Sequence, residues 1–268
     1  KTIENNVFSF TSIKKLVLPE TVEEIDSSNF CNVRSLVDIQ VSQKNKNFSY
    51  VNNQYLARKS DKKKSVFDVI VFVRRDIEEF KVPSHIKKIA ENAFQLCSHL
   101  NSIKFDSQSS LELIEKESFF EISGPEFLII PPSVKRIGDQ AFSHIKNLRF
   151  VEIRAKKIEL DFSPFCSCKN LEVISFPNAS EITFNCDYCF DLIPENTEFH
   201  MRKSVTFVGK GLDQFQSRIK FIENEDFKNK IVKFRLKIEN QSEKAKEKLN
   251  ENKNNEKLKD EKINSNDN

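Results

Sequence analysis

A phenylalanine recurs along this chain at an interval close to 23 residues. The best-defined copies are Phe94, Phe119, Phe142, Phe165 and Phe190, which are separated by 25, 23, 23 and 25 residues. Apolar or small residues hold most of the third, sixth, ninth and eleventh positions that follow each copy. A unit of this size cannot bury its own apolar stripe, whereas stacked units bury it against one another. The sequence therefore predicts a solenoid of stacked repeats.

The same pattern reaches towards the start of the chain. A further copy begins at Phe30. We expect a first, truncated copy to follow Val7, Phe10, Ile13, Leu16 and Leu18. Each unit ends in alternating apolar and polar residues, which predicts a short parallel strand with one buried face, preceded by a helical, 3-10 or turn segment. The expected fold is an α/β solenoid of about seven units of about 23 residues, a length within the leucine-rich repeat range.

One interval of the array is longer than the others. Phe30 and Phe94 are 64 residues apart, which is about 40 more than one repeat needs. The extra segment contains two runs rich in β-forming residues, 47–56 and 65–73, on either side of a lysine-rich stretch. This arrangement predicts a β-hairpin inserted at about residues 43–82, an insertion that a solenoid tolerates at little cost.

A second signature, Pro-x-x-(Val/Ile)-x-x-Ile, precedes three of the phenylalanines at a fixed spacing. The segments LPETVEEI (18–25), AFQLCSHLNSIKF (93–105) and IGDQAF (137–142) carry both signatures. In these segments the chain resembles the BspA-like leucine-rich repeat family, and the inserted hairpin is similar to an insertion common in that family. The resemblance spans about residues 7–201.

The resemblance implies a leucine-rich repeat solenoid over residues 1–201 and a role in protein binding. Members of the family are often cell-surface or secreted proteins of bacteria and protozoa, associated with adhesion to host matrix proteins or to other cells. The resemblance therefore implies a protein partner of that kind and a cell-surface or secreted location. It does not identify the ligand.

The composition changes after residue 201. Residues 202–240 are expected to form a C-terminal cap and an amphipathic helix, with a strand at Val205–Val208. Helical spacing is seen in Leu212, Phe215, Ile219 and Ile222, and again in Phe227, Ile231, Phe234 and Ile238. Residues 241–268 are mostly Lys, Glu and Asn, so we expect a disordered or solvated helical tail. A coiled coil is the alternative, although the apolar heptad does not persist.

Charge and residue counts exclude several classes of function. With 43 Lys and Arg against 40 Asp and Glu, the net charge of +3 is too small for a strongly basic nucleic-acid-binding domain. The four glycines leave almost no room for phosphate-binding loops. The four histidines lie at unrelated phases of the repeat and in no nucleophile motif. No apolar run approaches the roughly 18 residues of a membrane span. We therefore expect no enzyme, no cofactor, no nucleic-acid partner and no transmembrane segment.

The cysteines allow one alternative to simple packing. Cys166-x-Cys168 and Cys186-x-x-Cys189 are separated by 17 residues, close to the spacing of a two-knuckle zinc site. However, Cys168 occupies the buried third position of its repeat, and Cys189 takes the small-residue position that Ala141 holds. Only Cys186 lies at a position that the repeat pattern does not account for. In addition, Cys166-x-Cys168 has one intervening residue, whereas a zinc knuckle has roughly two to four. We expect packed thiols and no metal.

The candidate binding surface lies on the strands. The ninth and eleventh residues after each phenylalanine point inward, so the eighth and tenth face the opposite side of the sheet. The candidate partner-binding residues at these positions are Phe127, Ile129, Phe150, Glu152, Val173 and Ser175. A contiguous exposed apolar patch is typical of a partner site. The alternative is that the cap, the 227–238 stripe or a flanking strand covers this face.

Two functions are consistent with these observations. The first is a non-catalytic, adhesin-like module that binds a protein partner through its exposed sheet face. The second is an intracellular adaptor or scaffold, which the reduced-looking cysteines and the charged tail favour, with a cytoplasmic location. An enzyme, the third possibility, needs a clustered polar pocket that no motif predicts.

Overall fold

The computed structural model of the chain describes residues 1–209 and 216–221, together with Val232 and Leu236. The chain divides into two units, Lys1–Ile222 and Glu223–Asn268. The predicted stripe of Phe227, Ile231, Phe234 and Ile238 and the predicted tail at 241–268 lie outside the described residues, as do Leu212, Phe215 and Ile222. The described part of the second unit is Val232 and Leu236, both helical and exposed.

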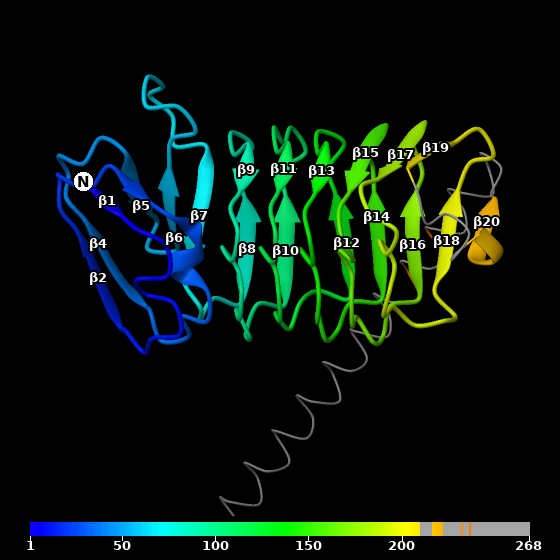
Figure 1. The fold of residues 1–268 in the computed structure, drawn as a ribbon, viewed down its shortest axis with the longest axis horizontal. Helices are drawn as coiled ribbons and strands as arrows, with labels where there is room; N and C mark the ends of the chain where they lie inside the picture. The colour runs from blue at the N-terminus through cyan, green and yellow to red at the C-terminus, as the bar shows by residue number, and fades with distance from the viewer. Residues whose placement is uncertain (210–215, 222–231, 233–235, 237–268) are drawn as a thin grey trace, which may run out of the picture. The chain divides into compact units, whose positions relative to one another are not determined.

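The first unit is a β-solenoid of about nine turns of about 23 residues. A typical turn contributes one strand to each of two sides, which we call side A and side B (Figure 1). Side A contains β2 (Lys15–Leu18), β4 (Asp38–Val41), β8 (Glu79–Val82), β10 (Ser102–Phe105), β12 (Phe127–Ile130), β14 (Phe150–Ile153), β16 (Val173–Phe176), β18 (Glu198–Met201) and β20 (Ile219–Phe221). Side B contains β1 (Thr2–Ile3), β3 (Glu24–Ile25), β9 (Lys88–Ile89), β11 (Leu113–Ile114), β13 (Arg136–Ile137), β15 (Lys157–Leu160), β17 (Glu181–Phe184) and β19 (Thr206–Gly209).

The helical part of the expected α/β class is not confirmed, because the segment around Phe94, Phe119, Phe142 and Phe165 is a turn, which is one of the expected alternatives. In the described part of the first unit, helix occurs only as the short 3-10 elements η1 (Ser27–Phe30) and η3 (Gln216–Arg218). Residues two positions before or after the phenylalanine have a positive φ, as in Gln140 (49°) and His144 (59°) around Phe142. Left-handed residues interrupt an α-helix. Here they direct backbone N–H groups towards the next turn, where the Phe142 N–H donates to the Pro164 carbonyl at 2.7 Å.

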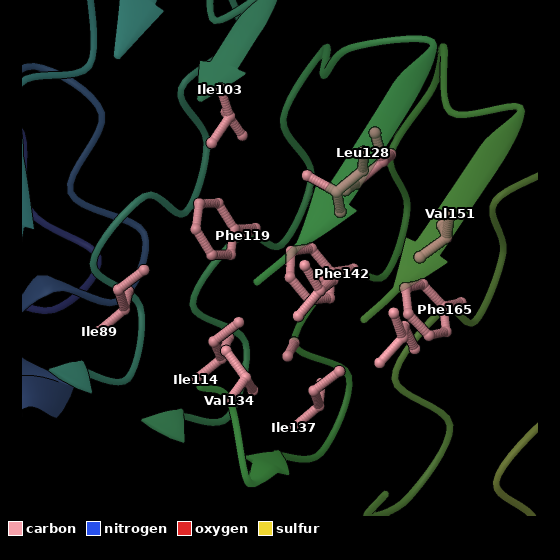
Figure 2. Packing of buried hydrophobic residues seen from close by; sticks show 14 of the residues in the cluster. Ile89, Ile103, Ile114, Phe119, Leu128, Val134, Ile137, Phe142, Val151 and Phe165 are labelled. Atoms are coloured by element: carbon pink, nitrogen blue, oxygen red, sulfur yellow. The ribbon is translucent and has the colours of Figure 1, made fainter. Parts of the chain in front are cut away.

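The phenylalanines form a continuous column through the core. The rings of Phe94, Phe119, Phe142 and Phe165 stack on one another at centroid distances of 4.5, 4.9 and 5.5 Å. Figure 2 shows Phe119, Phe142 and Phe165 of this column. A row of side A residues, including Leu128 and Val151, lies on one side of it, and a row of side B residues, including Ile137, on the other. Each turn adds one residue to each row, so the sequence period of about 23 residues is the length of one turn of the solenoid.

The first copy of the repeat is anchored one residue later than expected. Val7 and Phe10 are exposed, at 54% and 76% of their maximal accessibility, whereas Phe8 packs against the core. Phe10 also has a positive φ of 58°, as the residue two positions after each core phenylalanine usually does. The turn before β2 is one residue shorter than in the other copies, and this shifts the phase of the pattern.

The inserted segment contains three antiparallel strands, β5 (Phe48–Val51), β6 (Tyr55–Arg58) and β7 (Val69–Val73). The antiparallel pair of β6 and β7 flanks the lysine-rich stretch and forms a hairpin with it. On its other edge, β7 pairs in parallel with β9. The array resumes at Glu79, because β8 pairs in parallel with β10. Residues 79–82 are therefore a repeat strand and not part of the insertion.

The region after residue 201 continues the solenoid. β19 pairs with β17 on side B, at the place where a strand is predicted. β20 pairs with β18 on side A, so Ile219 lies in a strand and not in the predicted helix. The turn that contains β8 and the turn that ends in β20 raise the count above the seven units expected from the phenylalanines.

Candidate partner-binding surface

The outer face of side A carries the candidate residues in two parallel ladders. One ladder joins Phe127, Phe150, Val173 and Glu198 in register, and the other joins Ile129, Glu152, Ser175 and His200. Neighbouring strands lie about 4.8 Å apart, so residues of one ladder contact their neighbours directly. The structure thus brings together all six side chains that the sequence proposed.

The apolar ladder is built on an aromatic stack. The rings of Phe127 and Phe150 lie parallel, with centroids 4.4 Å apart and planes 9° apart. Beside the stack, the Arg149 guanidinium donates to the Glu172 carboxylate, with Nη2 2.5 Å from Oε1. Its other amino group lies 3.6 Å from Glu126 Oε2. The ion pairs satisfy charges at the start of the strands, so the apolar ladder is bordered by paired charges.

The second ladder contains polar groups that are buried. The Glu152 carboxylate is 6% exposed, and Arg154 Nε lies 2.5 Å from its Oε1. His200 Nε2 lies 2.8 Å from Oε2 of Glu198, a residue of the same strand that belongs to the first ladder. The Ser175 hydroxyl is fully buried, with no hydrogen-bond partner in the described part of the chain. Removal of one partner from a buried ion pair leaves an uncompensated charge and is destabilising, so substitutions of Glu152 are expected to affect folding.

The prediction that this face is exposed is wrong for most of its residues. Phe150, Glu152, Val173 and Ser175 are all buried, and Phe150 retains only 1% of its maximal accessibility. Phe127 and Ile129 are half-buried. In an in-register ladder, neighbours on both sides shield part of each side chain. Phe127 has Phe150 on one side, whereas the preceding side A strand offers only Ser102 at this position.

The side A strands that precede β12 are open and charged. On β8 and β10, Glu79, Lys81 and Lys104 are exposed, and Lys81 pairs directly with Lys104 across the two strands. Lys81 forms an ion pair with Asp106 at 3.0 Å. Lys104 has no carboxylate partner among the residues that the structure describes. Like charges opposite one another destabilise a sheet. The pair thus marks a basic position on an open face, which sequence spacing alone did not single out.

The structure places the four cysteines of the zinc-like spacing among residues that it describes. In the part of the chain that the structure describes, no group of three His, Cys, Asp or Glu side chains is placed to hold a metal. Cys168 is fully buried, and its Sγ lies 3.1 Å from the Phe142 carbonyl. Burial raises the pKa of the Cys168 thiol to about 12. Cys166 lies near Ser167, with Cys166 Sγ 3.5 Å from Ser167 Oγ.

Among the residues that the structure describes, no helix has the length and apolar character that crossing a bilayer requires.

Comparison with family models and with solved structures gives consistent results. The model described as "BspA type Leucine rich repeat region (6 copies)" matches residues 1–58, 67–191 and 112–236. No curated protein matches the chain.

Three solved structures share the fold. A leucine-rich repeat protein from Eubacterium ventriosum is 22% identical with a TM-score of 0.60, and the match covers 77% of this chain and 51% of that one. A leucine-rich cell surface protein from Faecalibacterium prausnitzii is 16% identical with a TM-score of 0.57, over 83% and 55%. The pneumococcal vaccine antigen PcpA is 19% identical with a TM-score of 0.52, over 82% and 57%. The chain thus spans between 51% and 57% of each of these proteins.

Proposed function

Because the chain belongs to the BspA-type leucine-rich repeat family, we propose that it is the non-catalytic protein-binding module of a cell-surface or secreted protein. The family is typically non-catalytic, and repeat arrays present extended surfaces to protein partners. Structural relatives include a protein described as a cell surface protein and another described as a vaccine antigen. These relatives support the surface location.

The contact surface that we propose is the border between β10 and β12 on side A. There, the half-buried Phe127 and Ile129 follow the exposed Lys81 and Lys104. Apolar anchors with a charged rim are typical of protein-binding sites. The buried Phe150 stacks against the Phe127 ring from the neighbouring strand and so supports it. Glu152, Val173 and Ser175 act in the same way as support and do not contact the partner.

Lys104, which has no carboxylate partner among the described residues, is the main support for this contact surface. A cross-strand Lys81–Lys104 pair costs stability on its own, and a carboxylate from a partner offsets the repulsion. We therefore expect the partner to present acidic side chains next to an apolar one. Electrostatic attraction of this kind speeds association and weakens as salt is added.

Binding of the purified chain to an immobilised panel of extracellular matrix proteins tests the proposal. Lys104→Glu and Phe127→Ser should each weaken binding by about tenfold or more, with the far-ultraviolet circular dichroism spectrum unchanged. Lys157→Glu is the matched control, because Lys157 is an exposed lysine on side B, where it pairs with Glu181 at 2.9 Å. Equal losses in the side B control, or full binding by Lys104→Glu, would contradict the assignment.

The intracellular adaptor remains the competing function, and location separates the two. Membrane-impermeant biotinylation of intact source cells should label a surface protein. A signal confined to the cytosolic fraction would instead support an adaptor.

A further inference from the structure

The cysteines Cys186 and Cys189 are adjacent in space. Their sulfur atoms lie 3.0 Å apart, in the turn between β17 and β18. Even carbon atoms, which are smaller than sulfur, make their best non-bonded contacts at roughly 3.5–4.0 Å. Neither cysteine forms a disulfide in the structure. The two thiols are therefore in closer contact than packing alone favours.

The repeat explains why these two positions meet. The residues equivalent to Cys186 and Cys189 in earlier copies close a tight turn by a backbone hydrogen bond. The Ala93 N–H donates to the Ala90 carbonyl at 3.2 Å, and the Ala141 N–H donates to the Gly138 carbonyl at 3.2 Å. The first and fourth residues of such a turn have Cα atoms less than about 7 Å apart, which overlaps the range of disulfides. Residues 187–190 also form a turn.

We propose that Cys186 and Cys189 are a thiol oxidation site, which a small-molecule disulfide converts into an intramolecular disulfide. The position of Cys186 is the one that the repeat does not explain by packing. The pair of small residues that closes earlier turns is replaced here by two thiols that face each other. Oxidising extracellular conditions favour such bonds, but the proposal does not depend on where the protein is located.

The order of the chemical steps follows from burial. Cys189 is buried, and burial, together with the neighbouring Cys186, raises the pKa of its thiol. Cys186 is only partly buried and so meets the oxidant first. Its thiolate attacks the small disulfide, which releases one small thiol and leaves a mixed disulfide on Cys186. Cys189 then loses its proton and displaces the second small thiol. Two protein thiols are oxidised, and one small-molecule disulfide is reduced.

The second cysteine pair, Cys166-x-Cys168, provides an internal comparison. Cys166 and Cys168 are both buried, and each sulfur contacts an oxygen, from Ser167 and Phe142 respectively. Among the described residues, the structure shows no sulfur–sulfur contact between them. We therefore expect Cys166 and Cys168 to stay reduced under conditions that oxidise Cys186 and Cys189.

Thiol trapping of the full-length chain tests the proposal. The folded, reduced protein is equilibrated with mixtures of reduced and oxidised glutathione, alkylated and digested with trypsin. Trypsin separates the two pairs, because one peptide spans 158–169 and the other spans 170–202. The 170–202 peptide should lose both alkylation sites and become lighter by two hydrogen atoms, while the 158–169 peptide keeps both of its sites.

The fold itself should favour the bond. We expect the glutathione equilibrium constant for Cys186–Cys189 to be at least about tenfold higher in the folded chain than in guanidinium. Cys186→Ser should abolish closure, and Cys166→Ser, the matched control, should leave it unchanged. The proposal is overturned if the folded and unfolded chains oxidise equally, or if glutathione remains attached to Cys186 without closure.

Discussion

Two regions of the solenoid bury similar residues in different ways. From Phe80 onwards, one core runs through successive turns, with its phenylalanine column stacked in parallel. The first two repeats have a separate core that ends on the inserted strands. Strand β7 divides the two: Ile70 and Val73 belong to the main core, and Val71 and Phe72 belong to the N-terminal one.

The packing of a repeat depends on which segment covers each of its two ends. A turn inside the main array is covered on both sides by copies of itself, so its packing follows from the period. The N-terminal repeats pack against the inserted strands instead, and the contacts there do not follow the repeat pattern. In place of a parallel stack, the Phe30 ring meets Phe72 at 4.9 Å with the planes tilted by 39°. Packing here depends on particular residues and not on the repeat.

Arg75 is the main such residue at the junction. Its guanidinium is buried and donates to the carbonyls of Phe30 and Val33 on one side and of Asn92 and Ala93 on the other, at 2.9–3.2 Å. It also lies over the Phe72 ring, 4.3 Å from the centroid. No carboxylate among the described residues pairs with it. Desolvation lowers the pKa of Arg75, yet the carbonyl oxygens solvate its charge.

The largest effect is expected in the regular core. Phe142→Ala removes the centre of the stack between Phe119 and Phe165 and leaves a cavity. The free energy of unfolding should fall by about 4 kcal/mol, as measured by urea denaturation. Phe142→Leu fills part of the cavity and is expected to cost about half as much. A loss below about 1 kcal/mol for Phe142→Ala would show that the stack is not the centre of the core.

The next effect concerns the junction. Arg75→Leu removes the guanidinium donor from four carbonyls. Three of these carbonyls keep a backbone donor, because Ala93 also accepts from the Val73 N–H, Asn92 from the Gln95 N–H and Phe30 from the Val33 N–H. We expect a loss of about 3 kcal/mol from the lost hydrogen bonds and the lost packing. Hydrogen exchange should accelerate more in the N-terminal repeats than in β12–β16, because the junction couples the two cores. Arg74→Leu is the matched control, since Arg74 binds the exposed Asp76 at 2.7 Å. Equal acceleration of hydrogen exchange in the two regions would contradict the expectation that the two cores unfold separately.

A third change tests a glycine-dependent turn of the regular array. Gly124 has a φ of 74°, and a Cβ built there would lie 2.1 Å from the Ile145 Cγ2 atom. Gly124→Ala combines backbone strain with overpacking and should lower stability by about 2 kcal/mol. The change in melting temperature, followed by circular dichroism, measures this loss of stability. An unchanged melting temperature would mean that the turn relaxes without strain.

The smallest effect lies in the insertion and depends on pH. Burial disfavours the charge on Asp68, but hydrogen bonds from Ser60 at 2.7 Å and the nearby Lys64 outweigh it and lower the pKa of Asp68. Because the folded pKa is lowered, the stabilisation is present above the ordinary value near 4 and is lost as pH falls through the folded value. Asp68→Asn should cost about 1 kcal/mol at pH 7.

The pH profile distinguishes this effect from a loss of packing. The difference in unfolding free energy between wild type and Asp68→Asn should be constant between pH 5 and 7 and should shrink below about pH 4. A difference that persists at pH 2 would show that the carboxylate charge is not involved.

Much of the array could be predicted from the repeat. The phenylalanine spacing predicted the column and the side A strands, because each position meets its own copy one turn away. The β12–β18 ladders followed from the same alternation. The side B strands other than β19 were missed. Of these, β9, β11 and β13 are only two residues long, and alternation needs about four residues to be recognised.

The exposure of the candidate face could not be predicted in the same way. The sequence by itself determined the period, the inward and outward positions and the family, since these depend on local spacing. Only the tertiary structure decided which outward positions are buried, how the insertion divides the core, and that Cys186 meets Cys189. Those outcomes depend on contacts between residues distant in the chain or on the geometry of a turn, and a one-dimensional pattern does not encode distances of that kind.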